Sequence, residues 1–469
     1  MPLMTAGDAR AEHDDHVADR ADPSGPTVGV RLPFPSGLVL EPFRALRYDP
    51  RRAGDLTALT SPPYDVVDPA GVQALEQASD HNVVRLILPR DDQVDGDRYA
   101  RAAATLAAWR AEGILRPDDV PALYVYEQAD PSGGHAQRGL LGALALTPPD
   151  DGIVLPHENT MAGPVADRLA LYTATEADLE PIFLVYAGGG AASRAVAEVS
   201  SDAPLVDVVL PDGLRHRLWA LTNPAALASI REDLQPRTAV IADGHHRYAT
   251  YLRRQADAHD AGRGDGPWDL GLAFLVDATA FGPQVHPIHR VVPGVDATTL
   301  AARAAAGATV QDLDGQELSA GLAALERAGA SGPAFLLCSG DAATLRLVEA
   351  LDADPLAATM PATRSAAWRS LDVSVLHAYV IPELWGLRDD EVSVGYEHDV
   401  TAALATAART GGTAVLLNPT PVDAVTEVAA GGERMPRKST LFTPKPRTGL
   451  VLRDHHDANP ADPAARPIP

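Results

Sequence analysis

The most chemically informative stretch of the sequence is Ile241–Tyr248, which reads IADGHHRY. An apolar run ends at Ala242, the glycine at 244 allows a tight turn, and a helix is expected to begin near His245. The first turn of a helix leaves amide groups free and carries the positive end of the helix dipole, so it favours an anion. Arg247 adds a planar fork suited to phosphate or carboxylate. These residue types predict a strand–turn–helix that handles phosphate.

The two imidazoles of this stretch, His245 and His246, are adjacent in sequence. On a helix they point about 100° apart, so they cannot share one metal as two histidines four residues apart do. The alternative to a ligand site is a helix capped by Asp243, with packed or solvated imidazoles. Two imidazoles and an arginine at one helix start favour the functional interpretation.

A second pattern lies at Leu155–Thr160, where a strand is expected to end just before His157 and Glu158. A carboxylate beside an imidazole at a strand end is well placed to act as a general base. Surface His-Glu pairs are common, so this pattern gains weight only when other evidence supports it.

A third pattern is the run Met435–Arg447, which concentrates cations in an acidic chain. The cations are Arg437, Lys438, Lys445 and Arg447. An anionic ligand, such as a nucleotide or a phosphorylated metabolite, would explain this concentration. A charged surface hairpin is the equally weighted alternative.

Two weaker patterns remain. His286 and His289 flank a proline, which disfavours a helix, and on a strand they face opposite sides, so a shared metal is not expected. Arg290, near the end of that strand, could reach a phosphate. Asp65, in a proline-rich turn, could bind Mg²⁺ or a substrate amine, or could simply belong to a structural turn.

Composition limits the class of protein. The 39 basic and 63 acidic residues give a net charge of −24, which disfavours binding to nucleic acid or to an acidic membrane. One cysteine, Cys338, allows neither an internal disulfide nor a cysteine-based zinc site. No apolar stretch is long enough for a membrane helix, and the first 30 residues do not resemble a signal peptide. A cytoplasmic protein is expected.

Helix and strand signals alternate along the chain, which predicts an α/β (α+β) protein with a mixed-sheet core. Residues 31–291 are expected to form an N-terminal α/β domain with the phosphate site. Residues 292–454 are expected to form an Ala-rich C-terminal α+β domain that contributes the basic segment. Polar composition predicts disordered tails at 1–30 and 455–469. Strands are expected at 83–88, 123–126, 181–186 and 238–242, and a hairpin-like segment at 438–452.

Four strings, in order, resemble the bacterial and archaeal proteins grouped as the domain of unknown function family 1015. They are PYDV at 63–66, HENT at 157–160, ADGHHRY at 242–248 and PRKSTLFTPK at 436–445. The resemblance covers roughly residues 35–452 and implies no activity by itself.

A more distant resemblance, to the free serine kinases of the ParB and sulfiredoxin superfamily, does imply an activity. It rests on Pro156-His157-Glu158, the apolar strand at 181–185 and the strand–turn–helix at 240–247. In such kinases the glutamate is the base for the serine hydroxyl and the DGHHR turn holds nucleotide phosphates. The turn lacks the cysteine that sulfiredoxin needs, and basic DNA-binding helices of the ParB type are not seen. The interval 159–242 departs from the kinase spacing and reads as an insertion.

The resemblance implies a nucleotide-dependent phosphotransferase that acts on a small hydroxyl-bearing metabolite with ATP or ADP and Mg²⁺. Glu158 would be the base, His246 and Asp243 would also be catalytic, and Asp243 would be a metal ligand. The substrate and phosphate contacts would be Gly244, His245, Arg247, His157, Arg290, Lys438, Ser439 and Lys445.

Two alternatives stay open, and the oligomeric state is undetermined. One is a metal-dependent hydrolase, and the other is a regulatory protein that binds a nucleotide or metabolite without turnover. The hydrolase would use some of His157, Glu158, His245, His246 and His289.

Overall fold

The computed structural model describes residues 36–90 and 97–456, which belong to one compact unit, Pro35–Pro469. The tails expected at 1–30 and 455–469 lie outside the described residues, apart from His455 and His456. The Nε2 atom of His455 lies 2.9 Å from the Oδ1 atom of the buried Asp178. The division at residues 291 and 292 stays a prediction. None of the described helices is long and apolar enough to cross a membrane.

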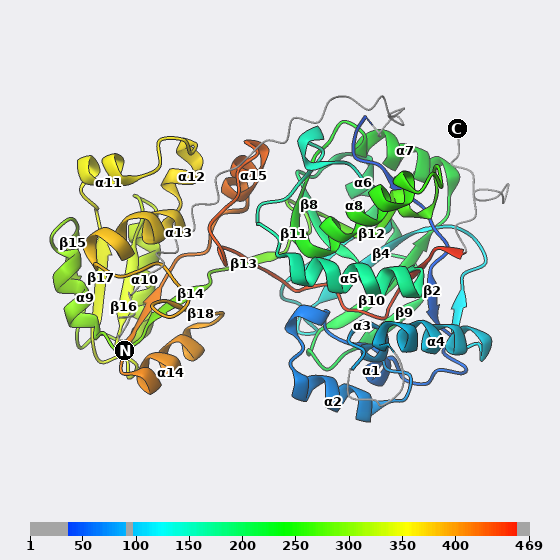
Figure 1. Cartoon of the computed structure of the whole chain (residues 1–469), viewed down its shortest axis with the longest axis horizontal. Helices are drawn as coiled ribbons and strands as arrows, with labels where there is room; N and C mark the ends of the chain where they lie inside the picture. Colours follow the sequence, from blue (N-terminus) through cyan, green and yellow to red (C-terminus); the bar gives the residue numbers. More distant parts are fainter. Residues whose placement is uncertain (1–35, 91–96, 457–469) are drawn as a thin grey trace, which may run out of the picture. The chain divides into compact units, whose positions relative to one another are not determined.

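A mixed nine-stranded sheet forms the first part of the fold, which confirms the α/β prediction (Figure 1). Its order is β6-β11-β8-β12-β5-β4-β10-β9, with β1 paired to β5. The strands are β1 (Leu40–Glu41), β4 (Leu123–Ala129), β5 (Ala136–Ala145), β6 (Val154–Leu155), β8 (Ile182–Tyr186), β9 (Val206–Val209), β10 (Arg215–Leu221), β11 (Ala239–Asp243) and β12 (Leu270–Asp277).

The central strand β8 is apolar along its whole length because both faces of this sheet are covered. In β8, Ile182 and Leu184 belong to one core cluster, whereas Phe183 and Val185 belong to another. This alternation is the two-residue period of a strand with a core on each side. Helices α4, α5 and α8 pack side by side, with α5 in the middle (Figure 1).

A six-stranded sheet forms the second part, in the order β15-β17-β16-β19-β14-β18. Its strands are β14 (His289–Val292), β15 (Thr309–Asp312), β16 (Phe335–Cys338), β17 (Leu345–Glu349), β18 (Gly395–Glu397) and β19 (Thr413–Leu416). Three two-stranded sheets pair β2 (Leu46–Tyr48) with β3 (Leu115–Pro117), β7 (Ala177–Asp178) with β21 (Arg453–Asp454), and β13 (Gln284–His286) with β20 (Leu441–Thr443).

The helices vary in length from single turns to the 16 residues of α8. They are α1 (Leu56–Leu59), α2 (Pro69–Ala78), α3 (Val84–Ile87), α4 (Arg98–Ala111), α5 (Ala162–Thr175), α6 (Gly190–Val199), α7 (Pro224–Leu234), α8 (His245–Asp260), α9 (Ala297–Ala304), α10 (Leu318–Gly329), α11 (Ala353–Thr359), α12 (Ala366–Ser370), α13 (Asp372–Val375), α14 (Val400–Thr410) and α15 (Val422–Ala430). A π-helix, η4 (Leu376–Leu384), follows α13, and short 3₁₀ turns lie at η1 (Tyr64–Val66), η2 (Pro149–Asp151) and η3 (Pro267–Asp269).

Two element predictions are wrong. The run expected as a strand at 83–88 contains the helix α3, because the period of so short an apolar run does not separate a helix from a strand. The hairpin-like segment expected at 438–452 does not pair with itself. Instead β20 pairs with β13, and β21, directly after this segment, pairs with β7 of the first part of the fold. The segment 441–454 is therefore paired with strands far away in sequence.

Candidate functional site

The pairing of β6 with β11 brings the two strongest sequence patterns together. The two strands run parallel, with Val154 opposite Ala239 and Leu155 opposite Val240. Parallel neighbours end at the same edge of a sheet, so the residues after β6 must lie beside those after β11. The backbone N–H of His157 accordingly donates to Nε2 of His245, at 3.2 Å. The long interval between the patterns is spanned by elements of the same sheet.

Gly244 makes the turn between β11 and α8. Its φ of +94° lies in the left-handed region that glycine adopts without steric cost. A Cβ atom there would also lie 3.0 Å from Nε of Arg247. Gly244 is the N-cap residue of α8, so the capping role considered for Asp243 is wrong, and its carboxylate is free for other contacts. The strand, turn and helix form where the sequence predicts them.

Three imidazoles surround this turn, and burial keeps each of them neutral. Burial lowers the pKa of His157 to about 4, lowers that of His245 well below its usual range, and also lowers that of the half-buried His246. The rings of His157 and His245 meet edge to face, with centroids 4.6 Å apart. His157 Nε2 lies 3.0 Å from the hydroxyl of Thr440, and His246 Nε2 accepts from the N–H of Met161 at 3.1 Å.

These imidazoles do not assemble a metal site in the described ranges. His289, the remaining histidine of the hydrolase hypothesis, is buried in β14 and accepts from the N–H of Leu417 through Nδ1. The group of described residues that could hold a metal lies elsewhere, at His259, Asp265 and Asp269. Hydrogen bonds of Asp269 to Gln255, His259 and the N–H of Gly266 already account for its carboxylate. In the described residues, the histidines of the hydrolase hypothesis therefore do not form a cluster of three metal ligands.

Glu158 is the residue whose electrostatics fit a general base. Its side chain is partly buried, and in the described part of the chain its carboxylate has no hydrogen-bond partner. Burial raises its pKa to about 7, with Lys438 and Lys445 lowering it and Asp243 raising it. A carboxyl group that titrates near neutral pH can accept a proton from a substrate and release it again. The charges that shift this pKa belong to Lys438, Lys445 and Asp243, so Glu158 lies near three residues that the sequence patterns had selected.

A partly buried ion network lies beside Glu158. The ammonium of Lys445 lies 2.6 Å from Oδ1 of Asp243 and 2.7 Å from Oδ2 of Asp65. Burial lowers the pKa of Lys445, but the two carboxylates outweigh burial and raise it overall. The pKa of Asp65 is lowered, since the cations Lys445 and Arg247 outweigh its burial. The ammonium of Lys445 thus lies between the two carboxylates and pairs with both of them.

Arg247 belongs to this network and not to the surface. Its side chain is about 1% exposed, and it donates to the carbonyl of Pro181 at 2.5 Å and to Oδ2 of Asp243. Burial opposes the charge of Arg247, yet Asp243, Glu180 and Asp65 hold its pKa above the usual range. A contact between Arg247 and phosphate, as the sequence suggests, stays a prediction, and in this structure the two terminal nitrogens of Arg247 donate to Pro181 and Asp243.

The basic turn, Pro436–Thr440, supplies the cation that is free for a ligand. Lys438 is exposed, has a left-handed backbone with φ of +55°, and has no partner for its ammonium among the described residues. The hydroxyl of Ser439 donates to the carbonyl of Pro436 inside the same turn. Arg290 is fully buried behind the turn and donates to the carbonyls of Arg437 and Lys438. The structure therefore brings Lys438 towards Glu158 and leaves Arg290 as a support.

Sequence reasoning missed two contributors to the site and underrated a third. Thr440 contacts His157, and the buried Glu180 accepts from the N–H of Tyr64 at 2.9 Å, so it holds the turn that carries Asp65. For Asp65, the sequence pattern favoured a binding role and a structural turn equally. The available signal was Glu180 itself, a carboxylate directly before an apolar strand, since a buried charge needs a partner.

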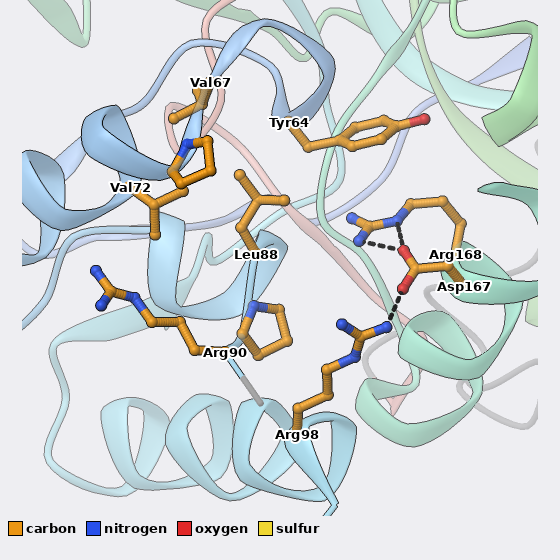
Figure 2. A pocket seen from close by; sticks show the side chains of 10 residues that line it. Tyr64, Val67, Val72, Leu88, Arg90, Arg98, Asp167 and Arg168 are labelled. Atoms are coloured by element: carbon orange, nitrogen blue, oxygen red, sulfur yellow. Dashed lines mark hydrogen bonds and ion pairs between the residues drawn. The ribbon is translucent and has the colours of Figure 1, made fainter. Parts of the chain in front are cut away.

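A cavity of about 400 Å³ lies beyond Tyr64 and contains none of the predicted site residues (Figure 2). One side is apolar, with Val72 and Leu88 among its residues. On the other side Asp167 accepts from both Arg98 and Arg168, as the dashed lines in Figure 2 show. The guanidinium of Arg168 lies over the Tyr64 ring at 4.4 Å. The guanidinium carbon of Arg247 lies 5.9 Å from the centre of the same ring, so Tyr64 contacts both the cavity and the ion network.

Comparison with known proteins gives a family and a set of distant structural matches. The model of a family described as protein of unknown function (DUF1015) matches residues 40–374. A free serine kinase in complex with AMP is 14% identical, with a TM-score of 0.32 over 72% of this chain and 94% of that chain. A mutant of free serine kinase in complex with ADP is 13% identical, with a TM-score of 0.33 over 72% and 95%.

SbnI with a C-terminal truncation, from Staphylococcus aureus, is 12% identical, with a TM-score of 0.33 over 69% of this chain and 90% of that chain. TM-scores at this level establish no shared function. No curated protein sequence matches the chain.

Proposed function

Because the chain belongs to the family of proteins of unknown function DUF1015, whose description gives no reaction, its activity must be inferred from the site, and we propose that it is a nucleotide-dependent phosphotransferase. The acceptor is a small hydroxyl-bearing metabolite. The observation that carries the proposal is the Glu158 carboxyl, which lies near Lys438, Lys445 and Asp243 and whose pKa burial raises to about 7. The motif resemblance to free serine kinases supports the same assignment.

In this mechanism Glu158 accepts the proton of the acceptor hydroxyl. The hydroxyl oxygen forms a bond to the terminal phosphorus of the nucleotide, and the bond from that phosphorus to the bridging oxygen breaks. Phosphoryl transfer depends mainly on positioning and charge neutralisation. Lys438 supplies a cation for the transferred group, and the free amides at the start of α8 receive phosphate oxygens. ATP or ADP would serve as the donor.

Two carboxylates of the site are suitable ligands for Mg²⁺, which prefers oxygen donors and usually binds through one or two carboxylates and the phosphates of a substrate. They are Asp243 and Asp65, which Lys445 now bridges at 2.6 and 2.7 Å. Mg²⁺ held there would neutralise phosphate charge. These residues therefore fit the expected ion.

The test is incubation of the purified protein with Mg²⁺, ATP or ADP and a pool of hydroxyl-bearing metabolites, followed by mass spectrometry. The expected result is a metabolite whose mass has increased by one phosphate, with AMP or ADP formed in equal amount. Tight nucleotide binding with no phosphorylated product across the pool would support the regulatory alternative instead.

Replacing His246 by alanine should abolish most of the phosphorylation while leaving the fold intact. The imidazole stands at the second position of α8, is half-buried, and holds the N–H of Met161, which precedes α5. His259→Ala, at the far end of the same helix, is the matched control and should retain activity. Initial rates and circular dichroism of both variants test this. Full activity of His246→Ala would remove this residue from the site.

A further inference from the structure

Arg290 is a buried cation, and no carboxylate among the described residues is hydrogen-bonded to it. It lies in β14, between β18 and β19, and its side chain is 0% exposed. Burial lowers its pKa to about 10. A buried charge costs free energy unless hydrogen bonds compensate it, and an apolar residue would fill the same space at lower cost. The role of Arg290 must therefore be sought in the groups that its donors hold.

The donors of Arg290 hold the backbone of the basic turn. One nitrogen, Nη2, lies 3.0 Å from the carbonyl of Lys438 and 3.3 Å from that of Arg437, while Nη1 donates to the carbonyl of Ile288 at 2.6 Å. Two successive carbonyls can face one donor only when the residue between them has a helical conformation, because in an extended chain successive carbonyls point opposite ways. Lys438 has such a conformation, with φ of +55°, which is sterically unfavourable for a residue other than glycine.

Three further contacts fix the orientation of the guanidinium. Its Nε donates to Nε2 of His377 at 2.9 Å, and Nδ1 of His377 lies 2.7 Å from the carboxylate of Asp389. Since Nε2 accepts, Nδ1 carries the proton and donates to Asp389. The ring of Tyr396, the cross-strand partner of Arg290, lies 4.6 Å from the guanidinium carbon and stacks on His377. All of the polar groups on Arg290 are thereby paired.

The ends of the basic turn are held by His157, which follows β6 of the nine-stranded sheet. The N–H of Met435 donates to the carbonyl of His157 at 2.8 Å, and Thr440 contacts the His157 ring. His157 precedes Glu158 directly, so the ends of the basic turn are tied to the residue beside the general base. Arg290 controls the middle, where Lys438 projects.

We infer that Arg290, oriented by His377, Asp389 and Tyr396, is a positioning residue that holds Lys438 in its left-handed conformation and so directs its ammonium to the Glu158 site. The link to catalysis rests on the proposed phosphotransferase function. The link to the conformation of Lys438 does not, and the two can be measured separately.

The conformational part is tested with a nitroxide spin label at Lys438→Cys. The native Cys338 is fully buried, and burial raises the pKa of its thiol to about 12, so it should not react with the label. The label should be immobilised with Arg290 present and become mobile in Arg290→Met. Arg303→Met, which loses one hydrogen bond to the carbonyl of Trp385, is the control and should leave the label unchanged. Unchanged mobility in Arg290→Met overturns the inference.

Variants of His377 separate orientation from packing. Glutamine can accept from Arg290 and donate to Asp389, so His377→Gln should keep the label immobile. Leucine can do neither, so His377→Leu should resemble Arg290→Met. Equal mobility in both His377 variants would show that this residue does not orient Arg290.

The catalytic part is tested by kinetics on proteins without the label. Lys438→Met should lower kcat by about 10²–10³-fold with little change in KM, as loss of one transition-state donor does. Arg290→Met should lower kcat in the same way, and the double variant should be no worse than Lys438→Met alone, because both act through one ammonium. Additive losses would contradict the inference. A wild-type protein without phosphorylation would refute the proposed function, and the spin-label result would still stand.

Discussion

Glu158→Gln should lower the rate of metabolite phosphorylation by about 10²–10⁴-fold, the usual contribution of a general base. Glutamine keeps the size of the side chain but cannot accept the proton. The wild-type rate should rise with pH through about 7 and then level, because the pKa of Glu158 is raised to about 7 and only the ionised form is a base. In the variant this step in the pH profile should disappear. Initial rates between pH 5.5 and 8.5 measure both effects.

Stability distinguishes a lost base from a damaged fold. A carboxyl whose pKa is raised on folding stabilises the protein below its unfolded pKa of about 4.5, and this contribution is lost as pH rises through about 7. Glu158→Gln should therefore be at least as stable as the wild type at pH 8, with a smaller advantage at pH 5. Glu176→Gln, a change at an exposed residue of the same charge, should alter neither rate nor stability. Full activity of Glu158→Gln would exclude this residue as the base.

Arg247→Met should lower the free energy of unfolding by about 3–5 kcal/mol, the cost of breaking a buried ion pair by removing one partner. The substitution leaves the carboxylate of Asp243 with one cation fewer and the carbonyl of Pro181 without its donor. Arg253→Met is the matched control on the same helix. Arg253 pairs with Asp257 on the exposed surface, and its loss should cost no more than about 1 kcal/mol. Denaturant titration at pH 7 measures the difference.

The same pair of variants decides what Arg247 does. If Arg247→Met retains wild-type stability and instead loses affinity for ATP or ADP, its guanidinium is a ligand contact, as the sequence pattern predicts. If stability falls and the remaining folded protein binds nucleotide normally, Arg247 is an internal support for Asp243. Calorimetric titration with each nucleotide in the presence of Mg²⁺ separates these outcomes.

Local patterns in the sequence determined the strand, the turn and the helix at 239–260. The apolar run before Asp243 has the composition of a buried strand, and Gly244 supplies a conformation that other residues avoid. Such features depend on neighbours a few residues away, so a sequence states them directly. The run at 83–88 shows the limit, because so few apolar residues have no period that distinguishes α3 from a strand.

The assembly of the site depended on contacts between residues far apart in sequence. Only the parallel pairing of β6 with β11 places Glu158 beside the turn at Gly244. Only the return of the chain's end inserts Lys445 between Asp243 and Asp65. Composition identified these cations as unusual in an acidic chain, but burial and partners decided their roles. Lys438 is exposed, whereas Arg247 and Arg290 are buried. A buried charge needs hydrogen-bond partners in the surrounding protein, so these two arginines donate to the protein and Lys438 remains available to a ligand.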